Sequence, residues 1–197
     1  MTSGRLAGAV LRRVRLMLDR FEPGALRAIK RSNAMDSVRS FEFSHLVFVC
    51  QGNINRSAFA EAYARSVFPP AMSISSCGLH TKVHRPSPPQ SVAVAADLGV
   101  DLGRHRSRSP LDVPSEKTLF VGFEEHHLAP WKQADVDDSR TVLIGVFGSD
   151  ARAPLYLPDP YRQSAEFTLS VFRDIRQCVN GLFRHVDASS EGTWRIA

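Results

Sequence analysis

Five residues separate a cysteine from an arginine in the segment 50–57, which reads CQGNINRS. A thiolate is a strong nucleophile, and the planar guanidinium group of an arginine binds two oxygens of an oxyanion at once. The spacing alone arises by chance in many proteins. The elements around the segment therefore decide whether Cys50 and Arg56 can do chemistry together.

The apolar run 45–49 predicts a buried strand that ends at Cys50, and apolar residues at helical spacing over 57–68 predict a helix directly after the arginine. A helix N-terminus with inward-pointing N–H groups favours a thiolate and holds phosphate oxygens. Gly52 and Asn53 are residue types that tolerate the positive φ angles of such a loop. The context predicts a phosphate-binding loop whose cysteine attacks phosphorus.

Each charged or hydroxyl side chain of this loop has a predicted role. Cys50 forms a cysteinyl-phosphate, and Arg56 clamps two phosphate oxygens into the transition state. The Ser57 hydroxyl hydrogen-bonds to the sulfur and stabilises the thiolate. We also expect contacts to the phosphate from the remaining loop residues, which are Gln51, Gly52, Asn53, Ile54 and Asn55.

A phosphate ester needs an acid that protonates its leaving oxygen. Asp159 lies in the segment Pro158-Asp159-Pro160-Tyr161, between the last predicted strand and the last predicted helix, where a loop reaches the carboxyl edge of the sheet. We predict that Asp159 acts first as the acid and then as the base for the hydrolytic water. The alternative is an aspartate that serves only the turn.

Strands alternate with helices along the chain, which predicts an α/β three-layer sandwich: a parallel sheet with helices on both faces and ligands at the carboxyl ends of its strands. An Ala/Val-rich helix ends at Gly99, and a short helix at 124–128 is stopped by Pro130. The closing helix is predicted from apolar residues between 167 and 186, with Ser164 as its cap. Further strands are predicted at 72–76, 117–121 and 141–147.

Composition bounds the class of protein. A chain of 197 residues with 43% apolar and 23% charged residues is typical of one globular domain. Its three cysteines, Cys50, Cys77 and Cys178, fit neither a disulfide framework nor a zinc site, so we expect a reducing, cytoplasmic compartment and no metal. The histidines, including His126-His127 and His185, show no ligand spacing and are interpreted as surface or packing residues.

The net charge of +5 is concentrated in residues 1–40, which hold nine Lys and Arg residues against three Asp and Glu residues. The rest of the chain is close to neutral, which argues against a nucleic-acid-binding fold. Apolar residues at helical spacing between 10 and 21 indicate a basic amphipathic helix. It could cover part of the main domain, rest peripherally on an anionic membrane or dock a partner. We therefore divide the chain into an N-terminal extension (1–40), a catalytic domain (41–188) and a C-terminal tail (189–197).

From about Phe43 to Val186 the chain resembles the low-molecular-weight protein tyrosine phosphatase family. The resemblance is carried by the loop 50–57, by Ser76-Cys77-Gly78, by 99–107 and by 158–161. It implies a four-stranded parallel sheet, no cofactor, and the same roles for the loop residues and the acid. It also implies that Asn53 shapes the loop, and that Ile54 and Tyr161 line a deep slot that favours phosphotyrosine.

The resemblance further implies a phosphotyrosine protein as substrate, such as a bacterial tyrosine kinase of capsule or exopolysaccharide assembly. The family commonly has a second cysteine just before the arginine, where this chain has Asn55, so Cys77 could stand in as a resolving thiol. Cys178 is expected in the core. Two other functions stay open, an arsenate reductase of the same fold and a non-catalytic phosphotyrosine-binding module, as does the oligomeric state.

Overall fold

The computed structural model of the protein describes residues 24–39, 41–114, 116–133, 138–149, 153–188 and 193–196. Its main feature is a parallel sheet in the order β3-β2-β4-β5. The bounds are β2 His45–Cys50, β3 Ser73–Gly78, β4 Thr118–Gly122 and β5 Thr141–Leu143. All four strands run the same way, so their carboxyl ends meet at one edge of the sheet.

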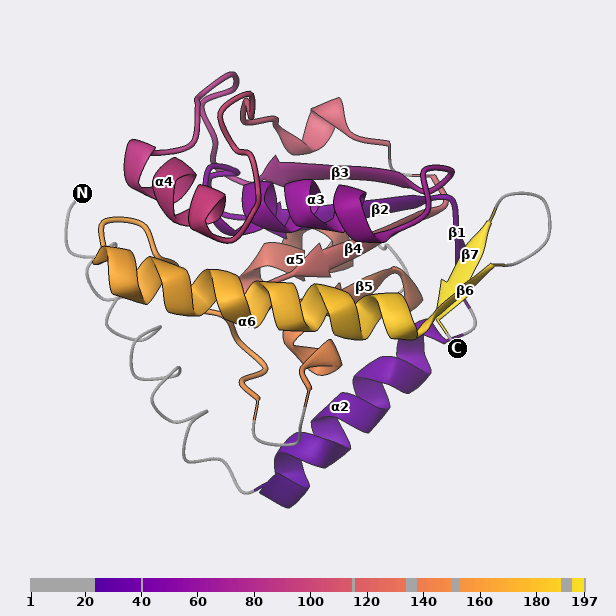
Figure 1. Ribbon diagram of the computed structural model, residues 1–197. Helices are drawn as coiled ribbons and strands as arrows, with labels where there is room; N and C mark the ends of the chain where they lie inside the picture. The colour runs from indigo at the N-terminus through magenta and orange to yellow at the C-terminus, as the bar shows by residue number, and fades with distance from the viewer. Residues whose placement is uncertain are drawn as a thin grey trace.

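Helices cover both faces of this sheet, which confirms the predicted three-layer sandwich (Figure 1). On one face lie α3 (Arg56–Val67), α4 (Pro89–Asp97) and α6 (Ala165–Arg184), and on the other lies α5 (Glu125–Gln133). Successive side chains of β2 point to opposite faces of the sheet, so they belong to two separate core clusters. Phe48 and Cys50 belong to the cluster with α3 and α6, whereas Val49 packs with Leu128 of α5. Three short 3₁₀ helices are η1 (Pro110–Asp112), η2 (Asp138–Arg140) and η3 (Ile144–Phe147).

Two predicted elements differ from the structure. The strand expected at 141–147 ends at Leu143 and turns into η3, which packs so tightly on α6 that a Cβ on Gly181 would lie 1.8 Å from the Phe147 carbonyl oxygen. The helix expected to stop before Pro130 continues to Gln133. A proline just past the first turn removes only one helical hydrogen bond, and Trp131 beyond it packs against the sheet.

Helix α6 follows its prediction closely. The Ser164 side chain accepts a hydrogen bond from the Phe167 N–H at 3.2 Å, as expected of an N-cap. The apolar side chains of Val171, Ile175 and Leu182 are buried against the core. The helix ends at Arg184, so Val186 begins the next strand instead of the last helical turn.

Replacing this cap should destabilise the fold without touching the site. We expect Ser164→Ala to lower the free energy of unfolding by about 1 kcal/mol, because the N–H of Phe167 loses its partner. Urea unfolding measures the change, with Ser170→Ala on the exposed side of the same helix as the control. Equal effects of the two substitutions would contradict a capping role.

A second, antiparallel sheet joins the ends of the described chain in the order β1-β7-β6, with bounds β1 Glu42–Phe43, β7 Trp194–Ile196 and β6 Val186–Ala188. The sequence interpretation set 189–197 apart as a tail. Instead, Trp194 pairs with Phe43 and Ile196 is fully buried. These strands of two or three residues are too short to carry a periodic pattern, so the pairing arises from tertiary contacts.

Part of the N-terminal extension forms α2 (Gly24–Val38), which lies beside β5 and η3. Val38 is fully buried, and the Arg31 guanidinium donates hydrogen bonds to the carbonyl oxygens of Val146, at 3.2 Å, and of Ala153. The apolar stripe expected between 10 and 21 lies outside the described residues. No helix among those described is long and apolar enough to cross a membrane.

Candidate active site

The loop that joins β2 to α3 adopts the predicted tight path. Asn53 has a φ of +49°, whereas Gly52, for which a positive φ was also expected, does not have one. The loop lies directly on β3, because a Cβ on Gly78 would come within 2.7 Å of the Asn53 nitrogen. Glycine at the end of β3 is therefore required for this approach.

Asn53 is fully buried, and its side chain and carbonyl group make four hydrogen bonds that fix the loop. Its Nδ2 donates to Ser57 Oγ at 2.9 Å and to Ser76 Oγ at 2.7 Å. Its Oδ1 accepts from the Arg108 backbone N–H at 2.8 Å, and its carbonyl accepts from His105 Nε2 at 2.7 Å. Burial lowers the pKa of His105, so this imidazole is favoured in the neutral form that donates through Nε2.

The sulfur of Cys50 lies 3.0 Å from Ser57 Oγ, and both residues are buried. Because Asn53 Nδ2 already donates to this oxygen, the Ser57 hydroxyl proton is directed toward the sulfur. A hydroxyl that donates to sulfur stabilises the thiolate over the thiol. The geometry of this contact is suited to a nucleophilic role for Cys50.

The backbone of the loop is arranged to receive an anion. Its carbonyl groups are bonded away from the centre: the Leu79 N–H donates to Cys50 O at 3.0 Å and the His80 N–H to Gln51 O at 2.9 Å. The N–H groups of residues 51–55 make no hydrogen bond within the described part of the chain. Such a set of N–H groups at the start of a helix forms an oxyanion cradle.

Arg56 is 1% exposed, and the Nη1 edge of its guanidinium group is hydrogen-bonded to the protein. Its Nη1 donates to Glu124 Oε1 at 2.5 Å and to the Leu157 carbonyl oxygen at 2.9 Å, while Nη2 lies 3.2 Å from Asp159 Oδ2. Among the described residues, the buried Nε has no hydrogen-bond partner. The Nε and Nη2 side of the fork therefore has the geometry to take two oxygens of one anion.

The charge of Arg56 is secured by its surroundings. Burial alone would lower its pKa, but the negative groups of Asp159, Cys50 and Glu124 outweigh burial and raise it. Glu124 is itself positioned by His127, whose Nδ1 accepts the backbone N–H groups of Phe123 and Glu124 at 3.2 and 3.1 Å. Sequence interpretation missed this role of Glu124, although an acid directly after the third strand was a usable signal.

The structure also brings together three potential metal ligands. One ligand atom each from Glu124, His126 and His127 lies within 4.8 Å of the others, a proximity that the sequence interpretation did not foresee. Glu124, however, is bonded to Arg56, and His127 Nδ1 accepts two backbone N–H groups. These contacts show that the cluster supports the arginine.

Asp159 reaches the loop from the far end of the chain, as predicted. Its Oδ2 faces Arg56, and its Oδ1 accepts the Tyr161 backbone N–H at 3.2 Å, while 43% of the side chain stays exposed. The neighbouring Pro160 is buried and fixes the backbone. The aspartate therefore closes a turn and also contacts Arg56, so its carboxyl group does more than serve the turn.

The other predicted contact residues surround this centre. Tyr161 is 40% exposed, and hydrogen bonds from Arg85 and Arg162 to its hydroxyl lower its pKa. Ile54 is buried in the loop, and Gln51 Nε2 donates to His80 Nδ1 at 2.7 Å. The Arg162 guanidinium also lies over the Tyr161 ring, 5.2 Å from its centroid.

The surroundings of Asn55, Cys77 and Cys178 do not favour a disulfide between Cys50 and a resolving cysteine. Asn55 Oδ1 accepts from Ser91 Oγ at 2.6 Å, which links the loop to α4. Cys77 packs on the α5 face of the sheet, opposite Cys50, and burial raises its pKa to about 12. Cys178 lies on the buried face of α6, and burial likewise raises the pKa of its thiol to about 12. A protonated thiol on the wrong face argues against Cys77 as a resolving cysteine.

The fold and the loop together define an α/β protein with an oxyanion site built from a cysteine and an arginine. A family model for low molecular weight phosphotyrosine protein phosphatase matches residues 45–191. A relative from Klebsiella pneumoniae, a putative low molecular weight protein-tyrosine-phosphatase, is 32% identical over 137 residues, which cover 68% of this chain and 92% of the relative. The chain belongs to the low molecular weight phosphotyrosine protein phosphatase family and is an enzyme of that class.

Solved structures agree with this assignment. The tyrosine phosphatase Wzb from Escherichia coli K30, in complex with sulphate, has a TM-score of 0.63 and 26% identity, covering 72% of this chain and 97% of its own. The YwlE arginine phosphatase from Geobacillus stearothermophilus has a TM-score of 0.61 at 18% identity, covering 72% of this chain and 91% of its own. The second likeness shows the fold alone.

Proposed function

We propose that the protein hydrolyses phosphotyrosine in proteins through a cysteinyl-phosphate on Cys50. The observation that carries the proposal is the convergence of the Cys50 sulfur, the Nε and Nη2 side of the Arg56 fork and the Asp159 carboxyl group on one cradle of backbone N–H groups. A nucleophile, an oxyanion clamp and an acid at one phosphate are what this reaction requires.

In the first step the Cys50 thiolate attacks phosphorus and the bond from phosphorus to the tyrosine oxygen breaks. Asp159 gives its proton to that oxygen, so tyrosine leaves as the neutral phenol. In the second step water attacks phosphorus, Asp159 takes a proton from this water, and the sulfur–phosphorus bond breaks. Ser57 stabilises the departing thiolate, and inorganic phosphate is released.

The contact between Asp159 and Arg56 must change when substrate binds. A phosphate that occupies Nε and Nη2 of Arg56 takes the place that Asp159 Oδ2 now holds. The carboxyl group is then released from the arginine and lies beside the bound phosphate, where the leaving oxygen needs a proton.

The choice of phosphotyrosine follows from the walls beside the cradle. Ile54 in the loop and Tyr161 near its mouth provide apolar and aromatic contacts suited to a phenyl ring. Family resemblance extends the proposal to a bacterial tyrosine kinase of polysaccharide export as substrate. The cysteine usage extends it to a cytoplasmic site of action, and the basic amphipathic pattern of the N-terminal extension (1–40) to peripheral membrane contact.

Three other activities are less well supported. Arsenate reduction needs a further reactive thiol, and Cys77 is buried with a raised pKa on the opposite face of the sheet. A module that only binds phosphotyrosine needs neither a nucleophile nor an acid. The fold likeness to an arginine phosphatase makes phosphoarginine a substrate that the first assay must include.

The deciding experiment measures kcat/KM on matched peptides that carry phosphotyrosine, phosphoserine or phosphoarginine. We expect selective turnover of phosphotyrosine. Turnover of phosphoarginine instead would replace the proposed substrate, and binding of phosphotyrosine without turnover would favour the binding module.

The acid is tested in the same assay. We expect Asp159→Asn to lower kcat for phosphotyrosine by about 10² to 10³-fold, because the phenolic oxygen must leave without a proton. The loss should be smaller for para-nitrophenyl phosphate, whose leaving group departs readily as an anion. Asp97→Asn on the exposed end of α4 is the control. An equal loss on both esters would contradict a role in protonating the leaving group.

A further inference from the structure

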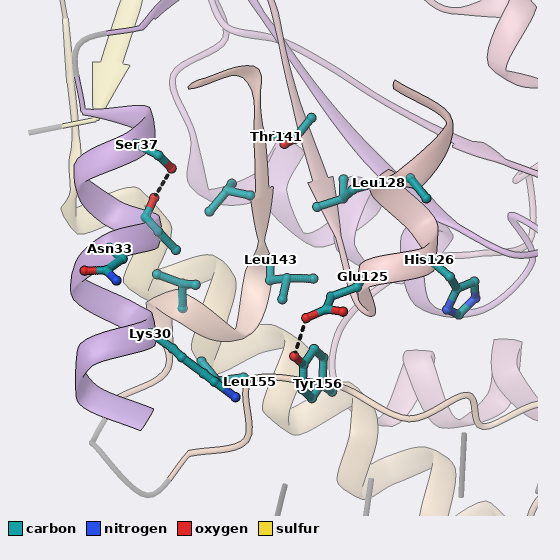
Figure 2. A pocket seen from close by; sticks show the side chains of 14 residues that line it. Lys30, Asn33, Ser37, Glu125, His126, Leu128, Thr141, Leu143, Leu155 and Tyr156 are labelled. Carbon is teal, nitrogen blue, oxygen red and sulfur yellow. Dashed lines mark hydrogen bonds between the residues drawn. The ribbon is translucent and has the colours of Figure 1, made fainter. Parts of the chain in front are cut away.

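A cavity of about 760 Å³ lies between α2 and the catalytic domain (Figure 2). One wall is α2, and the others come from α5, β5, η3 and the segment that ends at Tyr156. Helix α2 lies outside residues 45–191, which match the family model. The cavity is therefore built by an addition to the family's domain.

Seven of the fourteen lining residues are apolar, and the other seven carry polar or charged groups. The volume of the cavity falls in the range of small-molecule pockets. Lys30 and Glu125 contribute charges of opposite sign, so the cavity suits an uncharged molecule better than a phosphate or a nucleotide. The apolar lining consists of Ala34, Leu128, Ala129, Val142, Leu143, Val146 and Leu155.

One hydrogen bond in this lining leads to the active site. Figure 2 shows Glu125 and Tyr156 pointing toward each other, and the Tyr156 hydroxyl donates to Glu125 Oε1 at 2.7 Å. Glu125 follows Glu124 in the chain, and Tyr156 precedes Leu157. Those two neighbours accept the hydrogen bonds from Arg56 Nη1, at 2.5 and 2.9 Å.

The Tyr156–Glu125 hydrogen bond thus connects the two segments that accept hydrogen bonds from Arg56 Nη1. The Leu157 N–H also donates to the Phe123 carbonyl oxygen at 3.0 Å, which makes the same connection one residue nearer the site. A molecule that competes for Glu125 would break the outer of these two ties. The two supports of the arginine would then be connected by the Leu157–Phe123 hydrogen bond alone, so their positions relative to Arg56 would be less fixed.

We propose that this cavity binds a small uncharged molecule with an apolar body and a hydrogen-bond-donating head, and that its binding lowers phosphatase activity by drawing Glu125 away from Tyr156. The effect on activity rests on the function proposed above, whereas binding does not. The donating head is required because Glu125 is an acceptor, and the apolar body matches the side chains opposite.

Indole is a suitable probe because it is uncharged, largely apolar and carries one N–H donor. We expect calorimetry to show saturable binding of indole to the full chain, and binding at least about tenfold weaker for 1-methylindole, which lacks the donor. Ala34→Phe and Ala129→Phe fill the cavity from opposite walls and should each abolish binding. Ala28→Phe on the exposed side of α2 should leave it intact.

Binding that survives both cavity-filling variants with unchanged melting temperatures, or no saturable binding at all, would overturn the site. The regulatory part is read from para-nitrophenyl phosphate turnover. We expect saturating indole to lower kcat about fivefold, the lower end of common coupling between two sites. A rise in KM at constant kcat would instead place indole in the substrate slot and contradict the proposal.

Tyr156→Phe removes the bond permanently and distinguishes regulation from simple occupancy. We expect this variant to have a lowered kcat without any ligand and no further response to indole, while indole still binds. Binding with no change of kcat in the wild type would overturn the regulatory part alone. Lack of turnover without indole would contradict the proposed function, and calorimetry would still decide the site.

Discussion

Cys50→Ser is expected to abolish turnover of phosphotyrosine, with a loss of about 10⁴-fold or more in kcat. Serine can keep the hydrogen bond to Ser57, which is 3.0 Å from the sulfur in the wild type, and the cradle stays open to phosphate. A hydroxyl, however, is a far weaker nucleophile than a thiolate, so the covalent phosphate should form far more slowly. Steady-state release of phosphate and rapid quenching for a phosphoenzyme measure the two steps.

Binding separates this loss from a collapse of the site. The Cys50→Ser protein should bind a phosphotyrosine peptide about as tightly as the wild type, because the N–H groups and Arg56 are unchanged. Cys178→Ala, in the core far from the loop, controls for loss of a buried cysteine and should retain kcat. Single-turnover release of phosphate by Cys50→Ser would contradict the role of Cys50 as the nucleophile.

The central part of this site could be predicted because it is local. Cys50, Arg56 and Ser57 lie within eight residues, and the strand before them and the helix after them have clear apolar patterns. A distant residue, Asp159, was found with one topological rule, since loops at the carboxyl edge of a parallel sheet converge. The structure brings it to Arg56 as that rule requires.

The supports of the arginine could not be predicted in the same way. Glu124 follows the third strand at the same edge, so the rule that found Asp159 also applied to it, yet an acid at a helix start is commonly only a favourable charge. The carbonyl oxygen of Leu157 carries no signal in its residue type. Contacts over 68 and 101 residues depend on the packing of whole elements.

The same limit explains the errors in secondary structure. Residues 144–147 are apolar enough for a strand, but their contact with Gly181 of α6 selects a 3₁₀ turn. Pro130 is a helix breaker in isolation, and packing of Trp131 outweighs one lost hydrogen bond. In both places tertiary contacts override local propensity.

Arg56→Lys is expected to lower kcat by about 10³-fold while the protein stays folded. Nη1 of the guanidinium group donates hydrogen bonds to Glu124 and to the Leu157 carbonyl oxygen. Nε and Nη2 are the atoms proposed to bind the phosphate. An ammonium group keeps the charge but is a single point, so it cannot hold both supports and span two phosphate oxygens. Steady-state kinetics with a phosphotyrosine peptide measures the loss.

The division of that loss between binding and chemistry tests the mechanism. Because lysine keeps the positive charge in a buried site, affinity for inorganic phosphate should fall far less than affinity for vanadate, which adopts the five-coordinate geometry of the transition state. Arg173→Lys on the exposed side of α6 is the matched control and should change neither. Equal losses for both anions would show that Arg56 acts only as a charge, and the two-oxygen clamp inferred from its unpaired Nε would be wrong.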